Sequence, residues 1–343
     1  MGSQSANLGR NVVLSSSSLP LSVPGTTVDR QCGSSQQALH FATQAVMSGT
    51  QDIVIAGGAE SMSSVPMFSN MPKGLGAPNS DICQSKFGPG GFYSQFVGAE
   101  LIGTTYDISR EEQDVWAAQS HARAAAAQAA GLFDDEIVVV EGVDKEGSAV
   151  PHDADEGVRP TTTAEKLASL ETLVSLGMCD AVPGAPGGRV TVGNASQVSD
   201  GAAALLVANE AGLKKLGAGA TPLAEVVGLQ VVGSDPVLML SGPIPATEQL
   251  LARAGLSIGD VGLYEVNEAF ACVALAWCKQ LGADPARLNV NGGACALGHP
   301  LGGTGAKLMT TLVSQLQRGG ERYALQAICE GGGTANATLI ERC

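Results

Sequence analysis

The chain has 343 residues, of which 44% are hydrophobic and 15% are charged, and its formal net charge is −14. This composition supports a large buried core in two or three packed units and excludes a disordered chain. Because the net charge is negative and no block of lysine and arginine occurs, nucleic acid and anionic membranes are poor partners for it.

The sequence also indicates the compartment of the protein and the redox state of its cysteines. No apolar run is long enough to span a bilayer, and the polar residues 1–7 do not resemble a signal peptide. Eight scattered cysteines without paired spacing favour free thiols in a reducing compartment. We therefore expect a cytoplasmic protein without a membrane span. No Cys-x-x-Cys or His-x-x-x-His pair suggests a metal site.

The first part of the chain has a strand–turn–helix–strand pattern. The β-branched residues 26–30 predict a short strand, and a polar turn around Cys32 follows. Small and apolar residues on one face over 38–46 predict a helix that ends at Gly49. Residues 53–56 predict a buried strand closed by a glycine pair. Together these elements predict a βαβ unit.

Residues 66–189 differ in character, with many prolines and mixed charge. Apolar residues near 101–106 and 115–130 predict two or three helices, and 134–157 reads as a strand-and-turn segment. Residues 159–166 predict an extended stretch that enters a threonine-capped helix. We interpret this region as an insertion over the main body that serves as a substrate platform.

Core-like sequence returns after residue 190. Apolar patterns predict buried or strand-like segments at 202–208, 222–233, 261–266, 323–328 and 337–341, and helices at 246–254, after 270, and at 306–317. A glycine-flanked turn, a helix, a buried strand and a glycine pair occur in that order near both ends of the chain. This repeat predicts two related halves whose strand ends lie together, where ligands bind in such sheets.

Four polar or reactive residues follow predicted strands: Cys32, Asn267, His299 and Cys329. Cys32 precedes a helix, whose positive end favours the nucleophilic thiolate. His299 is held in a turn of glycines and a proline and can carry a proton near neutral pH, so it could take the thiol proton. Cys329, followed by three glycines, offers a second thiol. A single cysteine is more often a small buried hydrophobe, but the combination predicts a catalytic site.

The motifs around these residues resemble the thiolase family over residues 6–342. The matching motifs are Cys32-Gly33-Ser34, Asn267-Glu268-Ala269-Phe270, Gly298-His299-Pro300 and Cys329-Glu330-Gly331. The resemblance implies an α/β thiolase fold, with two βαβ-rich halves in a layered α-β-α-β-α arrangement and an inserted loop domain. Residues 1–65 and 190–215 would form the N-terminal half, 66–189 the loop domain with substrate and oligomer contacts, and 216–343 the C-terminal half.

The resemblance also implies an acyltransferase that cleaves 3-ketoacyl-CoA thiolytically, or condenses acetyl-CoA in reverse, through an acylated Cys32. His299 would activate Cys32, and Cys329 would be the acid/base for the acetyl-CoA enolate. One oxyanion hole would be formed by His299 and a water held by Asn267. The second would be formed by the backbone N–H groups of Cys32 and Gly331.

The same resemblance carries expectations about partners. Acyl-CoA and coenzyme A would be substrates, with no cofactor and no metal, and the residues that bind coenzyme A stay unassigned. The protein would be a homodimer or homotetramer that acts in fatty acid β-oxidation and lipid metabolism. Thiolysis is the expected direction, because it is the favourable one for the family.

Other interpretations stay open at this point. A condensing enzyme of the ketoacyl-synthase type would use two histidines, whereas Cys329 occupies the second position here. A cysteine hydrolase would not require Cys329. A non-catalytic thiolase-like protein that binds acyl-CoA, or serves as a subunit, is the third alternative, because family members begin with further strands. Since unpaired buried backbone groups are costly, we expect a shortened form of the family that is less stable and less active than a longer one.

Overall fold

The computed structural model describes residues 2–71, 74, 76, 79–88, 94–144 and 146–343. In chain order the elements are η1 (Gly2–Gln4), α1 (Leu8–Ser15), η2 (Gln31–Gly33), α2 (Ser34–Met47), β1 (Ile53–Ser61), α3 (Asp81–Phe87), α4 (Gln95–Thr105), α5 (Arg110–Ala129), β2 (Val140–Val143), β3 (Ala149–His152), α6 (Ala164–Ala168), β4 (Asp200–Ala208), α7 (Glu210–Leu216), β5 (Ala224–Gly233), α8 (Pro243–Ala254), η4 (Ile258–Asp260), β6 (Leu263–Val266), α9 (Ala271–Leu281), α10 (Ala294–Leu297), α11 (Thr304–Gly319), β7 (Tyr323–Glu330) and β8 (Thr334–Arg342).

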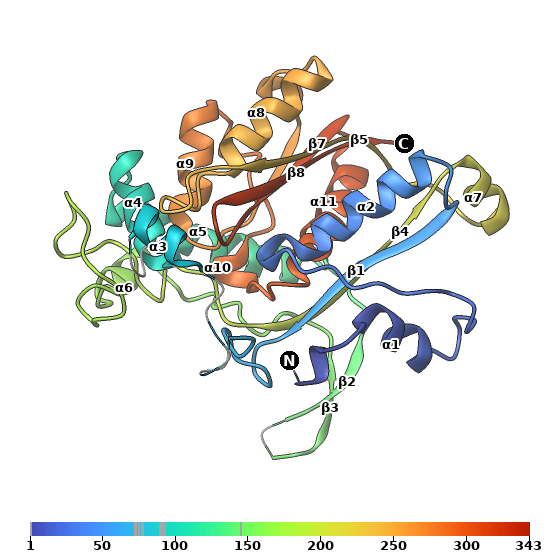
Figure 1. Cartoon of the computed structure of the whole chain (residues 1–343), viewed down its shortest axis with the longest axis horizontal. Coiled ribbons are helices and arrows are strands. Elements are labelled where there is room, and N and C mark those ends of the chain that lie inside the picture. Colours follow the sequence, from blue (N-terminus) through green and yellow to red (C-terminus); the bar gives the residue numbers. More distant parts are fainter. Residues whose placement is uncertain (1, 72–73, 75, 77–78, 89–93, 145) are drawn as a thin grey trace.

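The C-terminal part is built on a four-stranded sheet with the order β5-β8-β7-β6. β6 pairs with β7 in parallel, and the other two pairs are antiparallel. In Figure 1, α8 and α9 lie over one face of this sheet, and α2 and α11 lie on the other. Every residue of β7 after Tyr323 is buried. This explains why the strand reads as a continuous apolar run, as strands covered on both faces do.

A second, two-stranded sheet pairs β1 with β4 in antiparallel register, from Ile53 opposite Ala208 to Ser61 opposite Asp200. The helices α2 and α11 lie between the two sheets, and both contact β1 and β4. Leu39 of α2 and Leu312 of α11 belong to one buried cluster that joins the sheets. The layers are therefore helices, the four-stranded sheet, the helix pair and the two-stranded sheet (Figure 1).

Two predictions for the first half are wrong. Residues 26–30 form no strand, because β1 pairs only with β4 among the described residues. The segments 53–56 and 202–208 are strands but are not buried throughout: the side chains of Ile55 and Leu206 are 51% and 55% exposed. The reason is that only one face of this sheet packs on α2 and α11, so burial alternates along each strand.

The predicted internal repeat is confirmed. α2 leads into β1, which pairs antiparallel with β4, and α11 leads into β7, which pairs antiparallel with β8. The strands predicted at 222–233, 261–266, 323–328 and 337–341 and the helices predicted at 246–254 and 306–317 are also present. The halves differ because β7 has a parallel neighbour, β6, whereas no described strand pairs with β1 in parallel.

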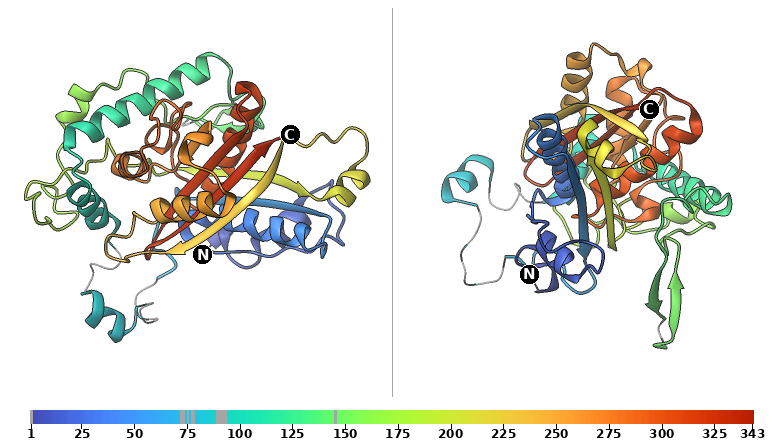
Figure 2. Two further views of the ribbon diagram at one scale, coloured as in Figure 1. Left: turned by 90° about the horizontal axis from the view of Figure 1, so that it is seen from above. Right: turned by 90° about the vertical axis from the view of Figure 1, so that its right-hand side faces the viewer.

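The region between β1 and β4 contains the predicted helices and the predicted strand-and-turn segment. The β2–β3 hairpin projects away from the main body (Figure 2). The side chain of Thr163 caps α6, as expected for the threonine-rich start. The long helix α5 contacts α9 and α10, which brings it beneath the predicted site. Within the described ranges, no helix has the combined length and hydropathy needed for a membrane crossing.

Candidate active site

Four elements carry the predicted catalytic residues to the junction of the two halves. Cys32 lies in η2 just before α2, Asn267 follows β6, His299 lies in the turn before α11, and Cys329 is in β7. All four side chains are buried, with at most 4% exposed. The backbone N–H of Asn267 donates to Ala327 O at 3.0 Å, so the end of β6 is fixed beside the end of β7.

The Cys32 turn packs directly on the glycine loop after β7. Hydrogen bonds from the backbone N–H groups of Gly331 and Cys32 reach the Cys32 thiol. The tip of the Gln31 side chain lies where a Cβ on Gly331 would be, so a larger residue there would have to displace this side chain. Arg30 Nε donates to Glu330 Oε2 at 2.7 Å and joins the same two loops. The two N–H groups predicted for an oxyanion hole therefore converge on one sulfur.

Electrostatics keep the Cys32 thiol protonated in the resting protein. Burial, and after it the negative charge of Glu330, raises the pKa of Cys32 to about 12, although the backbone hydrogen bonds lower it. We had expected the start of α2 to favour the thiolate, and this expectation is wrong because desolvation outweighs the helix end. Cys32 therefore needs a base at the moment of reaction.

His299 is the candidate for that base, because its ring is buried and uncharged in the resting protein. Burial, and after it the charge of Lys307, lowers the pKa of His299 to about 3, so the ring is neutral. Its Nδ1 lies 2.6 Å from Thr304 Oγ1, and its Nε2 lies 3.3 Å from Asn267 Nδ2. Its backbone N–H donates to Gln197 O at 3.2 Å, which holds the turn in place. A neutral imidazole can accept a proton without first losing one.

One of the two polar side-chain atoms of Asn267 has no hydrogen-bond partner among the described residues. Its Nδ2 faces His299, whereas its Oδ1 is buried and has no hydrogen-bond partner. A buried, unpaired amide oxygen is costly unless a ligand or a water satisfies it. Asn267 and His299, which the resemblance assigns to one oxyanion hole, thus contact each other, and Asn267 Oδ1 is open to the expected water.

Cys329 is completely buried, in a cluster that includes Phe270 and Met239. Burial, and then the charges of Cys32 and Glu330, raises the pKa of Cys329 well above its ordinary value. Both cysteines therefore rest as thiols, one in each half of the chain.

Close helix contact places the histidine turn against the cysteine turn. A Cβ on Gly305, in the first turn of α11, would collide with the backbone of Gln36 in α2. Ser35 Oγ accepts the backbone N–H of Ala306 at 2.9 Å across the same contact. The two helix starts are therefore locked together, and with them the turns that carry Cys32 and His299.

The sequence analysis assigns no role to Glu268, although its side chain supports the segment that carries Asn267. Its carboxylate is 1% exposed and is surrounded by four donors. These are Trp116 Nε1 at 3.0 Å, Ser120 Oγ at 2.8 Å, Asn289 Nδ2 at 2.9 Å and Cys295 N at 3.1 Å. The charge is thereby satisfied. In the sequence, Glu268 is visible only as part of the motif at 267–270, and nothing there indicates its four donors.

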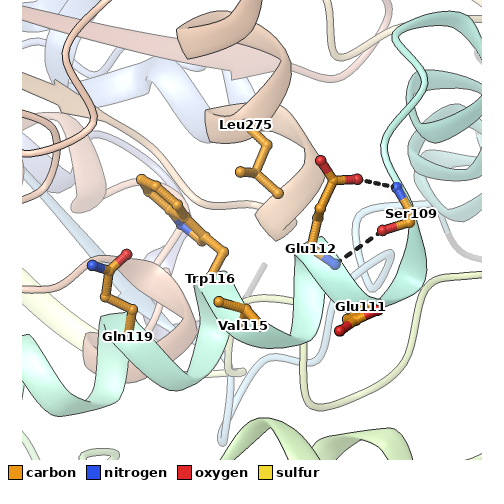
Figure 3. A pocket seen from close by; sticks show the side chains of 7 residues that line it. All are labelled: Ser109, Glu111, Glu112, Val115, Trp116, Gln119 and Leu275. Atoms are coloured by element: carbon orange, nitrogen blue, oxygen red, sulfur yellow. Dashed lines mark hydrogen bonds between the residues drawn. The ribbon is translucent and has the colours of Figure 1, made fainter.

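A hollow between α5 and α9 is lined by side chains from both helices. Figure 3 shows Trp116, Val115 and Leu275 lining it, beside the reciprocal hydrogen bonds of Ser109 and Glu112. None of the predicted catalytic residues lines it. Among the described residues, no group of His, Cys, Asp and Glu side chains could hold a metal ion.

Comparisons with known proteins agree with this geometry. Residues 2–211 match the thiolase N-terminal domain, and residues 220–342 match the thiolase C-terminal domain. Over 348 residues the chain is 47% identical to the steroid 3-ketoacyl-CoA thiolase FadA6 of Mycobacterium tuberculosis (strain ATCC 25618 / H37Rv), which covers 100% of this chain and 80% of that protein.

Solved structures give the same result. Human mitochondrial 3-ketoacyl-CoA thiolase matches with a TM-score of 0.82 and 39% identity, covering 98% of this chain and 83% of the human chain. The crystal structure of that human enzyme in complex with CoA matches with a TM-score of 0.78 and 38% identity, covering 95% and 80%.

The fold and the site define an enzyme that transfers acyl groups. The chain belongs to the thiolase family. The predicted fold class, an α/β thiolase fold with two related halves, is confirmed, and so is the prediction of an enzyme.

Proposed function

We propose that this thiolase cleaves 3-ketoacyl-CoA thiolytically and that Cys32 carries the acyl group between two half-reactions. One observation carries the assignment of Cys32: a buried thiol lies under the N–H groups of Cys32 and Gly331, at the junction that also holds a neutral His299. The names of the relatives, which include 3-ketoacyl-CoA thiolases, support the substrate class.

In the first half-reaction, His299 Nε2 takes the proton of Cys32, and the thiolate attacks the 3-keto carbon. The N–H groups of Cys32 and Gly331 stabilise the oxyanion that forms. The bond between carbons 2 and 3 then breaks and leaves the acyl group on Cys32. The enolate of acetyl-CoA forms beside protonated His299 and the Asn267 water, and Cys329 gives it a proton.

In the second half-reaction, Cys329 takes the proton of the incoming CoA thiol. The CoA thiolate attacks the acyl carbonyl on Cys32, and the acyl-CoA product leaves. Cys32 recovers its proton from His299, so all groups return to their resting states. Because Cys329 serves only the enolate and CoA while His299 serves Cys32, losing one residue should not have the same effect as losing the other.

Oligomer and compartment belong to the same proposal. The β2–β3 region exposes Val138, Val139 and Val143, an apolar surface that a second copy would bury in a homodimer or homotetramer. Eight free cysteines suit the reducing cytoplasm. Residues 66–189 would be the loop domain. Residues 1–65 together with 190–215 would form one half, and residues 216–343 would form the other. The reaction would serve lipid breakdown such as fatty acid β-oxidation, with acyl-CoA and CoA as substrates and no cofactor.

The test follows the acyl group. Purified protein is given acetoacetyl-CoA with and without CoA, and the CoA-dependent loss of acetoacetyl-CoA absorbance is recorded. Intact mass without CoA should show an acetyl adduct that maps to Cys32 and is absent from Cys32→Ala. No turnover with any 3-ketoacyl-CoA of a chain-length series would favour the non-catalytic alternative, and an adduct on another residue would overturn the assignment of Cys32.

A further inference from the structure

Thr304, the first residue of α11, contacts both the reactive histidine and the turn that carries it. Its Oγ1 lies 2.6 Å from His299 Nδ1 and 2.9 Å from Pro300 O. The side chain is 1% exposed, so water does not compete for these contacts. A hydroxyl has one hydrogen to donate and two lone pairs to accept with. The direction of each bond is therefore constrained.

The number of hydrogens that these groups can donate favours one tautomer of neutral His299. Pro300 O can only accept, so the Thr304 hydroxyl donates to it and accepts from His299 Nδ1–H. On the other side of the ring, Asn267 Nδ2 is a donor and faces Nε2 at 3.3 Å, which suits an unprotonated Nε2. In the opposite tautomer, Nε2–H would face the amide hydrogens of Asn267, and two donors would meet in a buried site.

We propose that Thr304 is a positioning residue that keeps the hydrogen of neutral His299 on Nδ1 and leaves Nε2 unprotonated, so that Nε2 can accept a proton. The inference rests on the proposed function, because only a proton acceptor at Nε2 can activate Cys32. In the opposite tautomer Nε2 carries a hydrogen, so it could not take the proton of Cys32.

The hydrogen bond between Thr304 and His299 also stabilises the histidine after it has accepted the proton of Cys32. Protonated His299 is a buried cation, and burial disfavours it. Thr304 Oγ1 then still accepts from Nδ1–H, while Nε2–H becomes a donor for the enolate oxygen. One fixed hydroxyl thus serves His299 as a base and, in the next step, as a donor.

The competing explanation is that Thr304 only strengthens the start of α11. Pro300 O also accepts the backbone N–H groups of Gly303 and Thr304, both at 2.8 Å, so this turn has support of its own. Thr310 provides a matched control, because its Oγ1 donates to the carbonyl of Ala306, four residues earlier on α11, at 2.9 Å and does not contact His299. Thr310→Val removes the same kind of bond.

The direct test is spectroscopic. Magic-angle-spinning NMR of protein labelled with ¹⁵N in its four histidines separates protonated from unprotonated ring nitrogens, and His299→Asn identifies the His299 signals. Wild type, Thr304→Ser and Thr310→Val should show hydrogen on Nδ1 of His299. Thr304→Val should move a measurable share of it to Nε2. Hydrogen on Nε2 in the wild type would overturn the inference, whether or not any variant folds.

Kinetics supply the second measurement. Thr304→Val should lower kcat for thiolysis, and the rate of Cys32 acetylation, by about 10- to 1,000-fold, on the scale of general-base contributions. KM should change little, Thr304→Ser should recover most of the rate, and Thr310→Val should match the wild type. Equal kcat in Thr304→Val and wild type would overturn the inference. A wild type that lacks turnover contradicts the proposed function instead, and the NMR result then still decides the tautomer.

Discussion

Glu330 Oε2 accepts a hydrogen bond from Arg30 Nε at 2.7 Å, across 300 residues of sequence, and this pair sits beside the Cys32 thiol. Thr334 Oγ1 donates to the same carboxylate oxygen at 2.6 Å, whereas Oε1 is buried without a partner. The glutamate therefore holds the loop of Gly331 against the turn of Cys32. It also places a negative charge where a thiolate must form.

Glu330→Gln should make Cys32 more reactive in the resting protein. Removing the carboxylate charge lowers the pKa of Cys32, because that charge is the second-largest cause of its elevation. Each unit of pKa shift changes the thiolate fraction about tenfold at a fixed pH below the pKa. Alkylation of Cys32 by iodoacetamide, followed by mass spectrometry across pH 7 to 9 (roughly one unit either side of an ordinary thiol pKa), should therefore be faster.

The matched control is Glu341→Gln. Glu341 Oε1 accepts from Arg322 Nε, also at 2.7 Å, on the exposed end of β8. This variant loses an ion pair of the same geometry without touching the site, so its alkylation rate should equal that of the wild type. A Glu330→Gln protein that reacts more slowly than this control would mean that the charge does not govern Cys32.

Local patterns are sufficient to nominate the candidate reactive residues, whereas the rest of the site depends on long-range contacts. Cys32 before a helix, His299 in a glycine turn and Cys329 at the end of a strand each depend on a few neighbouring residues. The strand expected at 26–30 depended on a partner strand, and none is present among the described residues. A β-branched run has strand propensity only as far as its surroundings let it pair.

The supporting contacts could not be predicted from spacing. Arg30 and Glu330 lie 300 residues apart, and Trp116 and Glu268 lie 152 apart. The pKa of Cys32 was predicted in the wrong direction for a related reason: the helix start is visible in the sequence, but the complete burial of the thiol is a property of the packed fold. Thr304 is five residues from His299, which is close enough for a sequence pattern to relate the two. Its role nevertheless depends on Asn267, the other hydrogen-bond partner of the His299 ring.

Cys329→Ser should separate the acylation of Cys32 from the proton transfers that we assign to Cys329. The variant should still acetylate Cys32 from an activated acyl donor, because His299 and the N–H groups at Cys32 are intact. Enolate protonation and CoA deprotonation should slow by about 100- to 10,000-fold, as is typical for loss of a general acid/base. Rapid-quench measurement of each half-reaction checks this.

Cys272→Ala is the control for losing a buried thiol from the same cluster. Its half-reactions should resemble those of the wild type, since its thiol bonds only to Ala99 O. Equal loss in the acetylation of Cys32 from the activated donor and in the two proton-transfer steps of Cys329→Ser would mean that Cys329 has a structural role.

Glu268→Ala should destabilise the fold strongly. It removes the shared acceptor of four buried donors, and each buried donor left unpaired costs about 1–3 kcal/mol. We expect the free energy of unfolding to fall by at least about 3 kcal/mol, measured by urea denaturation. Glu141→Ala, at an exposed position of β2, should change it little. A small loss in Glu268→Ala would show that other groups take over these hydrogen bonds.

Glu265 should make stability depend on pH. Burial raises the pKa of Glu265 to about 8, with the charges of Glu268 and Glu136 adding to it and a hydrogen bond from Gln315 opposing it. An unfolded glutamate titrates near 4.3. Between these two values the folded protein binds more protons than the unfolded chain. This contribution to stability is therefore complete below about pH 4.3 and is lost as the pH rises toward 8.

Glu265→Gln removes this titration while keeping an oxygen that can accept the hydrogen bond from Gln315 at 3.3 Å. The wild type should lose up to about 1.4 kcal/mol of unfolding free energy per pH unit from this one group. The variant should lack that slope, so its stability relative to the wild type should increase from pH 5 to pH 8, within the window between the two pKa values. Urea denaturation at several pH values in this range measures the difference. Parallel curves for the two proteins would mean that Glu265 is ionised in the folded state at pH 5 and that a positive charge, such as that of Lys307, compensates its burial.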